Sequence, residues 1–442
     1  MLFPTIEFTG FFLLFFLLWE GFGTTPLRRQ NLLAAGSAVF YAAASPFMLA
    51  YLVAWTLVLW IAGRNPKRAV ALGSVGAGIL QLAFWKAFEL VPRSELPPYL
   101  AHIAIPLGVS FFTFQGLTYL FQRMKGELPE PWPLLRVFSF CAFFPTVVSG
   151  PILRARDWYR DLEAPATPNI EKAMAALVMG LLYKLVFSTL LAGFTDSLYS
   201  EPAAQNSLGL WLGLYAYAFQ LYCDFCGYSL MAWGVCALLG FEVTANFDRP
   251  YMATSVQEFW RRWHMSFSQW LRDYLYIAAL GGNRKGPVRK IINVLTTFML
   301  CGAWHGFALH YLVWGAWHAV AVAWSSLSRL KIPGWLSRIL AFHLVALGWV
   351  FFRANSLSDA TDYLGTLFSS KAEWQSEYML VLAWLVGAVL LHVFEHRILR
   401  GVADLAVRLR YAVFQAGYWA LLVVLVLLAS PPGLPPFIYA SY

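Results

Sequence analysis

The run LLVVLVLL (Leu421–Leu428) and the run FFLLFFLLW (Phe11–Trp19) show most directly how this chain folds. Neither run alternates between apolar and polar residues, as a half-exposed strand would. An element that is hydrophobic all round is a deeply buried or membrane-embedded helix. Inside a bilayer the backbone must satisfy its own hydrogen bonds, which leaves only helices or closed barrels. The two runs therefore predict membrane-spanning helices.

Composition extends this prediction to the whole chain. Of its 442 residues, 60% are hydrophobic and only 12% are charged, and the mean hydropathy is +0.59. A soluble globular protein has about 25% charged residues. Apolar runs recur along the chain, although several are shorter than the roughly 20 residues of a full crossing. We expect an all-α, polytopic membrane protein with about 11 transmembrane helices and some re-entrant or interfacial helices, forming a single domain over residues 1–442.

The charge pattern indicates a membrane partner and excludes nucleic acid. The formal net charge is +9, but the Lys and Arg residues gather in short segments between the apolar runs. Such clusters set the orientation of a multi-pass protein in the bilayer. The first apolar run has no basic residue before it and no clear cleavage site after it, so we expect a retained first span and not a signal peptide.

One segment departs from this pattern. Residues 242–290 include 12 charged residues, twice the average density of the chain, together with three tryptophans. Within it, Ser255–Tyr276 has the periodicity of an amphipathic helix lying in the membrane interface. Ser255 and Glu258 fit a capping box at its start. The polar face of this predicted helix holds Gln257, Trp260, Arg261, His264, Ser268 and Arg272.

His305, in the sequence CGAWHGF, is the strongest candidate for a catalytic residue. An ionisable group at membrane depth is costly and usually faces a cavity or a partner. A neutral imidazole can accept a proton at physiological pH and so act as a general base. Gly302 and Gly306 flank it and would permit close approach of backbone or substrate. The alternative, a core histidine bonded to a neighbouring helix, stays open on these grounds.

Other polar groups give weaker indications. His264 could orient a substrate or support the base, or it could be an interfacial residue. His310 and His318 do not share one helix face with His305, so a three-histidine metal site is not predicted. Cys223 and Cys226 form a CxxC inside an apparent span, without a second pair or a suitably spaced His, which favours packing over metal or redox chemistry. The sequence contains no GxSxG, GxxxxGK[ST] or HExxH motif.

Several motifs, taken in order, resemble the membrane-bound O-acyltransferase family, and in particular its bacterial branch of alginate O-acetylation and teichoic acid D-alanylation proteins. The strongest are FWRRWHMSFSQWLRDYLY (Phe259–Tyr276) and WHG (Trp304–Gly306). The others, which occur in the order of the family, are Ile105–Gln115, Phe143–Arg154, Tyr222–Phe241, Asn246–Tyr251 and Gly281–Arg284.

The resemblance implies a ring of helices around a central funnel, with functional histidines at His305 and His264. It implies a thioester donor from the cytoplasm, either acyl-CoA or the phosphopantetheine of an acyl carrier protein, which would be a co-substrate and not a bound cofactor. No metal is implied. The residues that would shape the substrate site are Asp224, Asn246, Trp260, Arg261, Arg262, Trp263, Arg272, Asp273 and Trp304.

The sequence thus predicts an O-acyltransferase in the bacterial cytoplasmic (inner) membrane. It would move an acetyl-type or D-alanyl-type group to a hydroxyl of an extracytoplasmic polysaccharide, an envelope polymer or a periplasmic or extracellular relay protein. The alternative is a transporter or flippase for an acylated or lipid-linked envelope precursor, since intramembrane polar residues also suit a permeation path.

Overall fold

The computed structural model describes residues 3–97, 105–284, 286–327, 332–409 and 411–431, and every regular element in them is helical. This confirms the predicted all-α class. The chain divides into two compact units, one formed by residues 1–177 with 229–244 and the other by residues 178–228 with 245–442. We call them unit 1 and unit 2. The prediction of a single domain stays a prediction.

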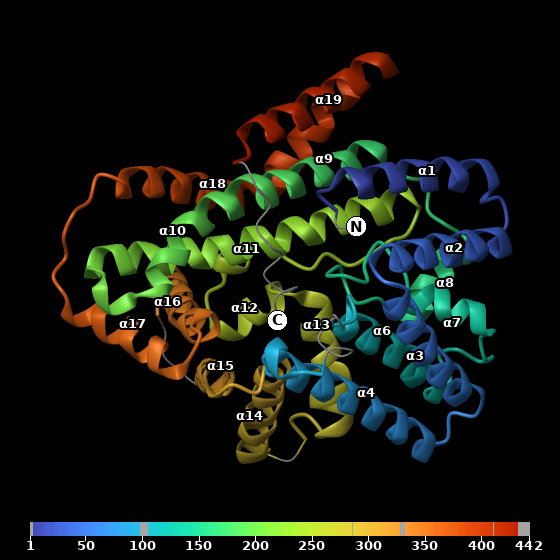
Figure 1. Ribbon diagram of the computed structural model, residues 1–442, viewed down its shortest axis with the longest axis horizontal. Helices are drawn as coiled ribbons and strands as arrows, with labels where there is room; N and C mark the ends of the chain where they lie inside the picture. The colour runs from blue at the N-terminus through green and yellow to red at the C-terminus, as the bar shows by residue number, and fades with distance from the viewer. Residues whose placement is uncertain (1–2, 98–104, 285, 328–331, 410, 432–442) are drawn as a thin grey trace. The chain divides into compact units, whose positions relative to one another are not determined.

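Unit 1 is built from the N-terminal helices (blue to cyan in Figure 1). Several of these helices begin at residues suited to the position. Thr5 accepts a hydrogen bond from the backbone N–H of Phe8, and Thr25 precedes Pro26, which has no N–H to satisfy in the first turn. The helices are α1 (Ile6–Phe22), α2 (Pro26–Ala44), α3 (Pro46–Arg64), α4 (Arg68–Glu89), α6 (Val109–Met124), α7 (Leu134–Cys141) and α8 (Ala155–Glu163).

Unit 2 contains the motifs Asn246–Tyr251, Phe259–Tyr276 and Trp304–Gly306, which hold most of the predicted site residues. The chain passes from unit 1 to unit 2 within α9 (Ile170–Leu181), returns to unit 1 within α11 (Ser207–Leu238), and enters unit 2 again after Thr244. The other helices of unit 2 are α10 (Thr189–Ser200), α12 (Val256–Arg262), α13 (Met265–Trp270), α14 (Gly286–His305), α15 (Leu309–Leu327), α16 (Gly334–Arg353), α17 (Leu357–Ser369), α18 (Tyr378–Arg408) and α19 (Ala412–Ala429). Unit 2 also contains two π-helical turns, Leu182–Ser188 and Leu271–Ala279.

Seven helical segments within the described residues are long and apolar enough to cross a bilayer, which confirms a multi-pass membrane protein. The run Leu421–Leu428 belongs to α19, and its end residues are more than half exposed, as lipid-facing side chains would be. The predicted count of about 11 and the central funnel stay predictions. The seven segments are Pro46–Arg64, Ala69–Glu89, Ile170–Ser200, Ser207–Leu238, Gly334–Arg353, Tyr378–Arg408 and Ala412–Ala429.

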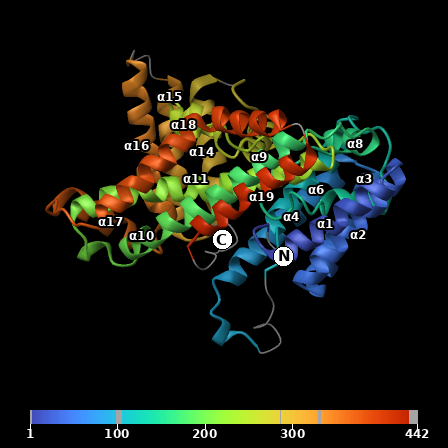
Figure 2. The ribbon, with the colours of Figure 1, turned by 90° about the horizontal axis from the view of Figure 1, so that it is seen from above.

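The α14–α15 hairpin and its neighbour α16 form the part of unit 2 that positions the site. Figure 2 shows α15 and α16 side by side. Two glycines allow α14 and α15 to approach closely. A Cβ on Gly302 would collide with the carbonyl oxygen of Tyr311, and one on Gly315 would collide with that of Phe298. The helix backbones therefore meet at positions where only glycine fits.

Candidate active site

His305 is the last residue of α14, where the chain turns into α15. Its imidazole is 7% exposed and is enclosed by aromatic rings. The ring centroids lie 4.4 Å from Trp304, 5.1 Å from Trp314 and 4.9 Å from Phe352. Phe307, two residues further on, is 46% exposed, so the chain reaches the surface directly after His305. The surrounding aromatic rings restrict the orientation of the imidazole.

The glycines beside His305 serve backbone packing. Gly302 contacts the Tyr311 carbonyl as described above, and a Cβ on Gly306 would lie 2.7 Å from the Tyr311 ring. The expected close approach of backbone is confirmed at Gly302, whereas the close neighbour of Gly306 is a side chain. These contacts hold the end of α14, and hence His305, against the start of α15.

The segment Ser255–Tyr276 is not one continuous amphipathic helix, and that prediction is wrong. α12 ends at Arg262 and α13 begins at Met265, followed by the π-helical turn 271–279. The break occurs because His264 has φ 42° and ψ 55°, in the left-handed region. The capping prediction is confirmed at Ser255, whose side chain accepts a hydrogen bond from the backbone N–H of Glu258.

His264 is buried, and one of its neighbours is the side-chain amide of Asn246. The side chain is 3% exposed, and its Nδ1 lies 3.4 Å from Oδ1 of Asn246. Phe225 and Phe267 pack against the ring, with centroids 4.6 Å and 5.1 Å away. Burial lowers the pKa of His264 to about 3. The imidazole is therefore neutral at physiological pH.

The two histidines are connected by a chain of aromatic contacts. Phe267, which contacts His264, also lies 4.6 Å from the ring of Trp304, which adjoins His305. α13 and α14 thus share an aromatic contact at the level of the predicted site. These contacts bring His264, His305, Asn246 and Trp304 into one neighbourhood. Their roles in the site stay predictions.

Two adjoining cavities lie beside these helices. We call one the inner cavity because its lining reaches Cys301, about one helical turn before His305 on α14. It has a volume of about 410 Å³, is mainly apolar, and is also lined by Trp260 and Phe267. The outer cavity, of about 490 Å³, is basic, and its cationic lining residues are Arg261, Arg272, Arg284 and Lys290. Both cavities are lined by Gln257, Arg261, Arg272, Tyr276, Val294 and Val322. Three of the predicted site residues, Trp260, Arg261 and Arg272, therefore face a cavity.

The remaining predicted residues lie in packing or ion-pair contacts. Trp263 is buried and packs against Phe247 and Trp349. Asp273 pairs with Arg272 at 2.8 Å. Asp224 forms a buried ion pair with Lys184 of the π-helical turn 182–188.

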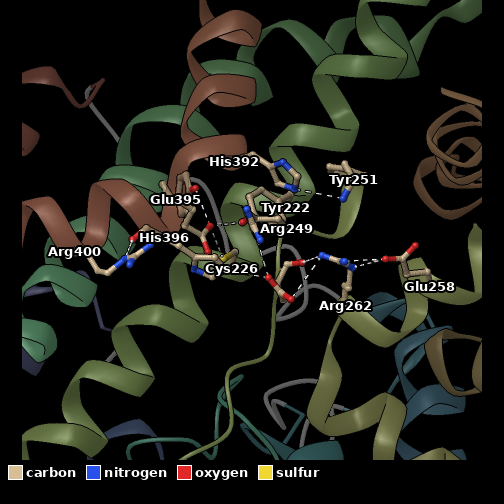
Figure 3. A network of polar contacts seen from close by, with 12 residues as sticks. Tyr222, Cys226, Arg249, Tyr251, Glu258, Arg262, His392, Glu395, His396 and Arg400 are labelled. Carbon is tan, nitrogen blue, oxygen red and sulfur yellow. Dashed lines mark hydrogen bonds and ion pairs between the residues drawn. The ribbon is translucent and has the colours of Figure 1, made fainter. Parts of the chain in front are cut away.

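Arg262 belongs to a polar network that joins α12 to α18 (Figure 3). It pairs with Glu258 at 2.8 Å and with Asp248 at 3.6 Å, and Asp248 also pairs with His396 of α18 at 3.0 Å. Burial disfavours the charged form of Asp248. The hydrogen bond from His396 and the nearby cations nevertheless hold the pKa of Asp248 below its usual value. This network fastens the loop before α12 to α18.

The carboxyl of Glu395, the residue before His396, extends the contacts of α18 to α11. Its Oε2 accepts hydrogen bonds from the hydroxyls of Tyr183, at 2.9 Å, and Tyr222. Figure 3 shows Glu395 and Tyr222 on facing helices. α18 therefore contacts the polar core of unit 2 through two adjacent residues.

Comparison with known families decides the class of the protein. The model of the membrane-bound O-acyltransferase family matches residues 39–351, which include every predicted site residue. The chain belongs to the membrane-bound O-acyltransferase family. It is accordingly an acyltransferase, and the resemblance seen in its motifs is confirmed.

The names of relatives of this O-acyltransferase refer to the O-acetylation of alginate or peptidoglycan and to the D-alanylation of teichoic acid. A probable alginate O-acetylase of Pseudomonas fluorescens is 36% identical over 78% of this chain and 71% of its own. A peptidoglycan O-acetyltransferase of Helicobacter pylori is 29% identical over 82% of this chain and 77% of its own. A teichoic acid D-alanyltransferase of Bacillus subtilis is 31% identical over 64% of this chain and 77% of its own.

Sequence reasoning missed one residue that contacts the site of this O-acyltransferase. His318 of α15 is fully buried, and its Nδ1 lies 3.3 Å from the indole Nε1 of Trp260. Helical spacing puts His318 and His305 on different helix faces, so the sequence did not predict that His318 contacts the site. A usable signal was present, since a histidine inside an apolar helix is expected to have a named partner.

Proposed function

We propose that the protein transfers an acyl group of the acetyl or D-alanyl type from a thioester to a hydroxyl. The thioester would arrive from the cytoplasm on coenzyme A or on the phosphopantetheine arm of a carrier protein. The acceptor would be an extracytoplasmic polysaccharide, another envelope polymer or a relay protein. The protein would act in the cytoplasmic membrane of a bacterium. The pair of adjoining cavities is the observation that best supports this proposal.

The basic outer cavity suits the phosphate of such a donor. Among the described residues that line it there is no Asp or Glu. Arg261, Arg284 and Lys290 form no ion pair with a carboxylate in the part of the chain that the structure describes. Cations held together without a counter-ion repel one another, so a bound anion would relieve this cost. Both carriers of an activated acyl group bear phosphate next to the pantetheine arm.

The inner cavity suits the arm and its acyl group. It reaches Cys301, which precedes His305 by four residues on α14 and therefore lies on the same helix face. A thioester extending inward past Trp260 would approach the end of α14 that carries the imidazole. The exposed area of the cavity walls is mainly apolar, as is typical of sites that bind such a chain.

The proposed chemistry assigns one proton to His305. Its neutral imidazole takes the proton of the acceptor hydroxyl as the oxygen attacks the thioester carbonyl. The tetrahedral intermediate then expels the thiolate, which receives that proton from the imidazolium, and the products are an ester and a free thiol. A positioned base of this kind contributes about 10²–10⁴-fold. His264 would position the donor or assist the proton transfer.

The test is acyl transfer by the purified full-length protein in detergent or nanodiscs. Acetyl-coenzyme A is supplied with a soluble polysaccharide acceptor, and both free thiol and ester are quantified. We expect His305→Ala to lower the rate by about 10²-fold or more. His343→Gln is a matched control, because that imidazole bonds to Tyr215 away from the cavities. A His305→Ala rate within a few-fold of the unmodified protein would remove His305 from the central role.

A further inference from the structure

Asn246 presents its side-chain oxygen to two groups besides His264. The Oγ of Ser266 donates to Oδ1 at 2.7 Å, and the backbone N–H of Ser266 donates to the same atom at 3.4 Å. A backbone N–H can only donate, so the amide is oriented with its oxygen toward Ser266 and His264. The orientation of the Asn246 amide is therefore fixed by the backbone N–H of Ser266, which can act only as a donor.

This orientation determines the tautomer of His264. The amide oxygen accepts hydrogen bonds and cannot donate them. The ring nitrogen that faces it, Nδ1, must then carry the proton. In a neutral imidazole the other nitrogen, Nε2, holds the lone pair. His264 can accept a hydrogen bond or a proton only at Nε2.

The local backbone keeps the two residues together. The backbone N–H of Met265 donates to the carbonyl of Asn246 at 2.8 Å, and the N–H of Asp248 donates to the carbonyl of Arg262 at 3.0 Å. These bonds attach residues 262–265, which include the left-handed His264, to the segment 246–248. Asn246 is 2% exposed, so no bulk water competes for its oxygen.

We propose that Asn246 is a positioning residue, which fixes His264 as the Nδ1–H tautomer and thereby makes Nε2 its accepting atom during acyl transfer. This inference rests on the proposed function of His264. It adds that the neutral amide of Asn246 orients the His264 ring without contributing a charge, as a carboxylate would. A carboxylate at position 246 would stabilise the imidazolium and change the chemistry available to His264.

Most of the charged residues on the elements around His264 form ion pairs. Asp224 of α11 pairs with Lys184, and Arg272 pairs with Asp273. Arg262 of α12 pairs with Glu258 and Asp248, whereas Arg261 is exposed and lines the cavities. The nearby imidazoles of unit 2 include His305 of α14 and His318 of α15, which bonds to Trp260. Introducing a carboxylate at position 246 is therefore the most direct way to alter the charge beside His264.

The kinetic test compares variants of Asn246 over a pH range from about 5 to about 9. We expect Asn246→Ala to lower kcat/KM roughly tenfold, but to change it less than about twofold when His264 is already Ala. Asn246→Asp keeps the shape and the accepting oxygen. It should add an ionisation near the ordinary histidine pKa, about 6.5, below which the rate falls. Asn206→Asp is the control, since Oδ1 of Asn206 also accepts a backbone N–H but lies at the start of α11.

A spectroscopic test does not depend on activity. Nitrogen-15 NMR of the protein labelled at histidine should show His264 with a proton on Nδ1, and Asn246→Asp should convert that signal to an imidazolium at low pH. Additive losses in the double variant, or an Nε2–H tautomer, would overturn the inference. Absence of thioester-dependent transfer by the unmodified protein would instead overturn the proposed function. If Asn246→Ala does not fold, Asn246→Asp decides the question alone.

Discussion

The indole N–H of Trp260 donates a hydrogen bond to Nδ1 of His318, with the two nitrogens 3.3 Å apart. This bond joins α12, which carries the predicted donor-binding residues, to α15, which packs against the helix of His305. It also fixes one wall of the inner cavity, because Trp260 lines that cavity. The cavity wall and the proposed base are thus held by the same helix.

Replacing His318 with Leu should destabilise the protein by about 1–3 kcal/mol, because the half-buried indole N–H of Trp260 loses its acceptor. His318→Gln, which retains an acceptor, should cost less. The measurement is the free energy of unfolding in detergent. In the Trp260→Phe background the cost of His318→Leu should shrink, and equal costs in both backgrounds would contradict the role of this bond.

Acidification should destabilise the protein through His264. Its folded pKa of about 3 lies below the value in the unfolded chain, about 6.5. The unfolded state therefore binds the proton first, so stability is full above pH 6.5 or so and is lost as pH falls toward 3. One such proton gives a slope of up to about 1.4 kcal/mol per pH unit. A His264→Gln variant should show a shallower dependence over this range, and an unchanged slope would contradict the assignment.

The buried pair Lys184–Asp224 should be more sensitive to the loss of one partner than of both. Lys184→Met leaves a buried carboxylate without its cation, which costs about 3–5 kcal/mol. The double variant Lys184→Met with Asp224→Leu should recover most of the folded yield. If the recovered protein also transfers acyl groups at the normal rate, Asp224 is structural. If folding recovers and transfer does not, Asp224 belongs to the substrate site.

Adding one methyl group at Gly302 should impair acyl transfer. The new Cβ would collide with the Tyr311 carbonyl, so the end of α14 must shift by a fraction of an ångström or more. Small displacements of a catalytic group cost up to about 10²-fold in rate. Gly401→Ala is the control, because a Cβ there meets no atom within 4 Å. Equal rates for the two variants would show that the Gly302 contact does not position His305.

Neutralising the outer cavity should weaken binding of phosphate-bearing donors. Arg284→Gln with Lys290→Gln should raise KM for acetyl-coenzyme A by about tenfold or more, since each charge-assisted hydrogen bond contributes about 1.5–3 kcal/mol. The increase should diminish at high ionic strength. Arg289→Gln changes a neighbouring cation that does not line the cavity and serves as the control. A thioester of N-acetylcysteamine lacks phosphate. It should be used equally well by the unmodified protein, the double variant and Arg289→Gln.

The sequence predicted the features that depend on composition and short spacing. Long apolar runs indicated an all-helical membrane protein, and the motif around His305 placed an imidazole at the end of an apolar helix. The break at His264 was not predictable, because periodicity does not report the sign of φ. The contact of His318 with Trp260 depends on how α12 packs against α15, which residues 58 positions apart do not reveal. Side chains that share a predicted face, such as Arg261 and His264, lie respectively at a cavity and in the core.

The left-handed backbone at His264 lowers the stability of the fold at the same residue whose imidazole is proposed to take part in acyl transfer. A non-glycine residue in this conformation costs about 1–3 kcal/mol, which a glycine would avoid. The simplest stabilising change at this position would therefore also delete the imidazole. Any effort to make the protein more heat-resistant should leave residue 264 untouched and seek its gains elsewhere, for example at the exposed helical glycines.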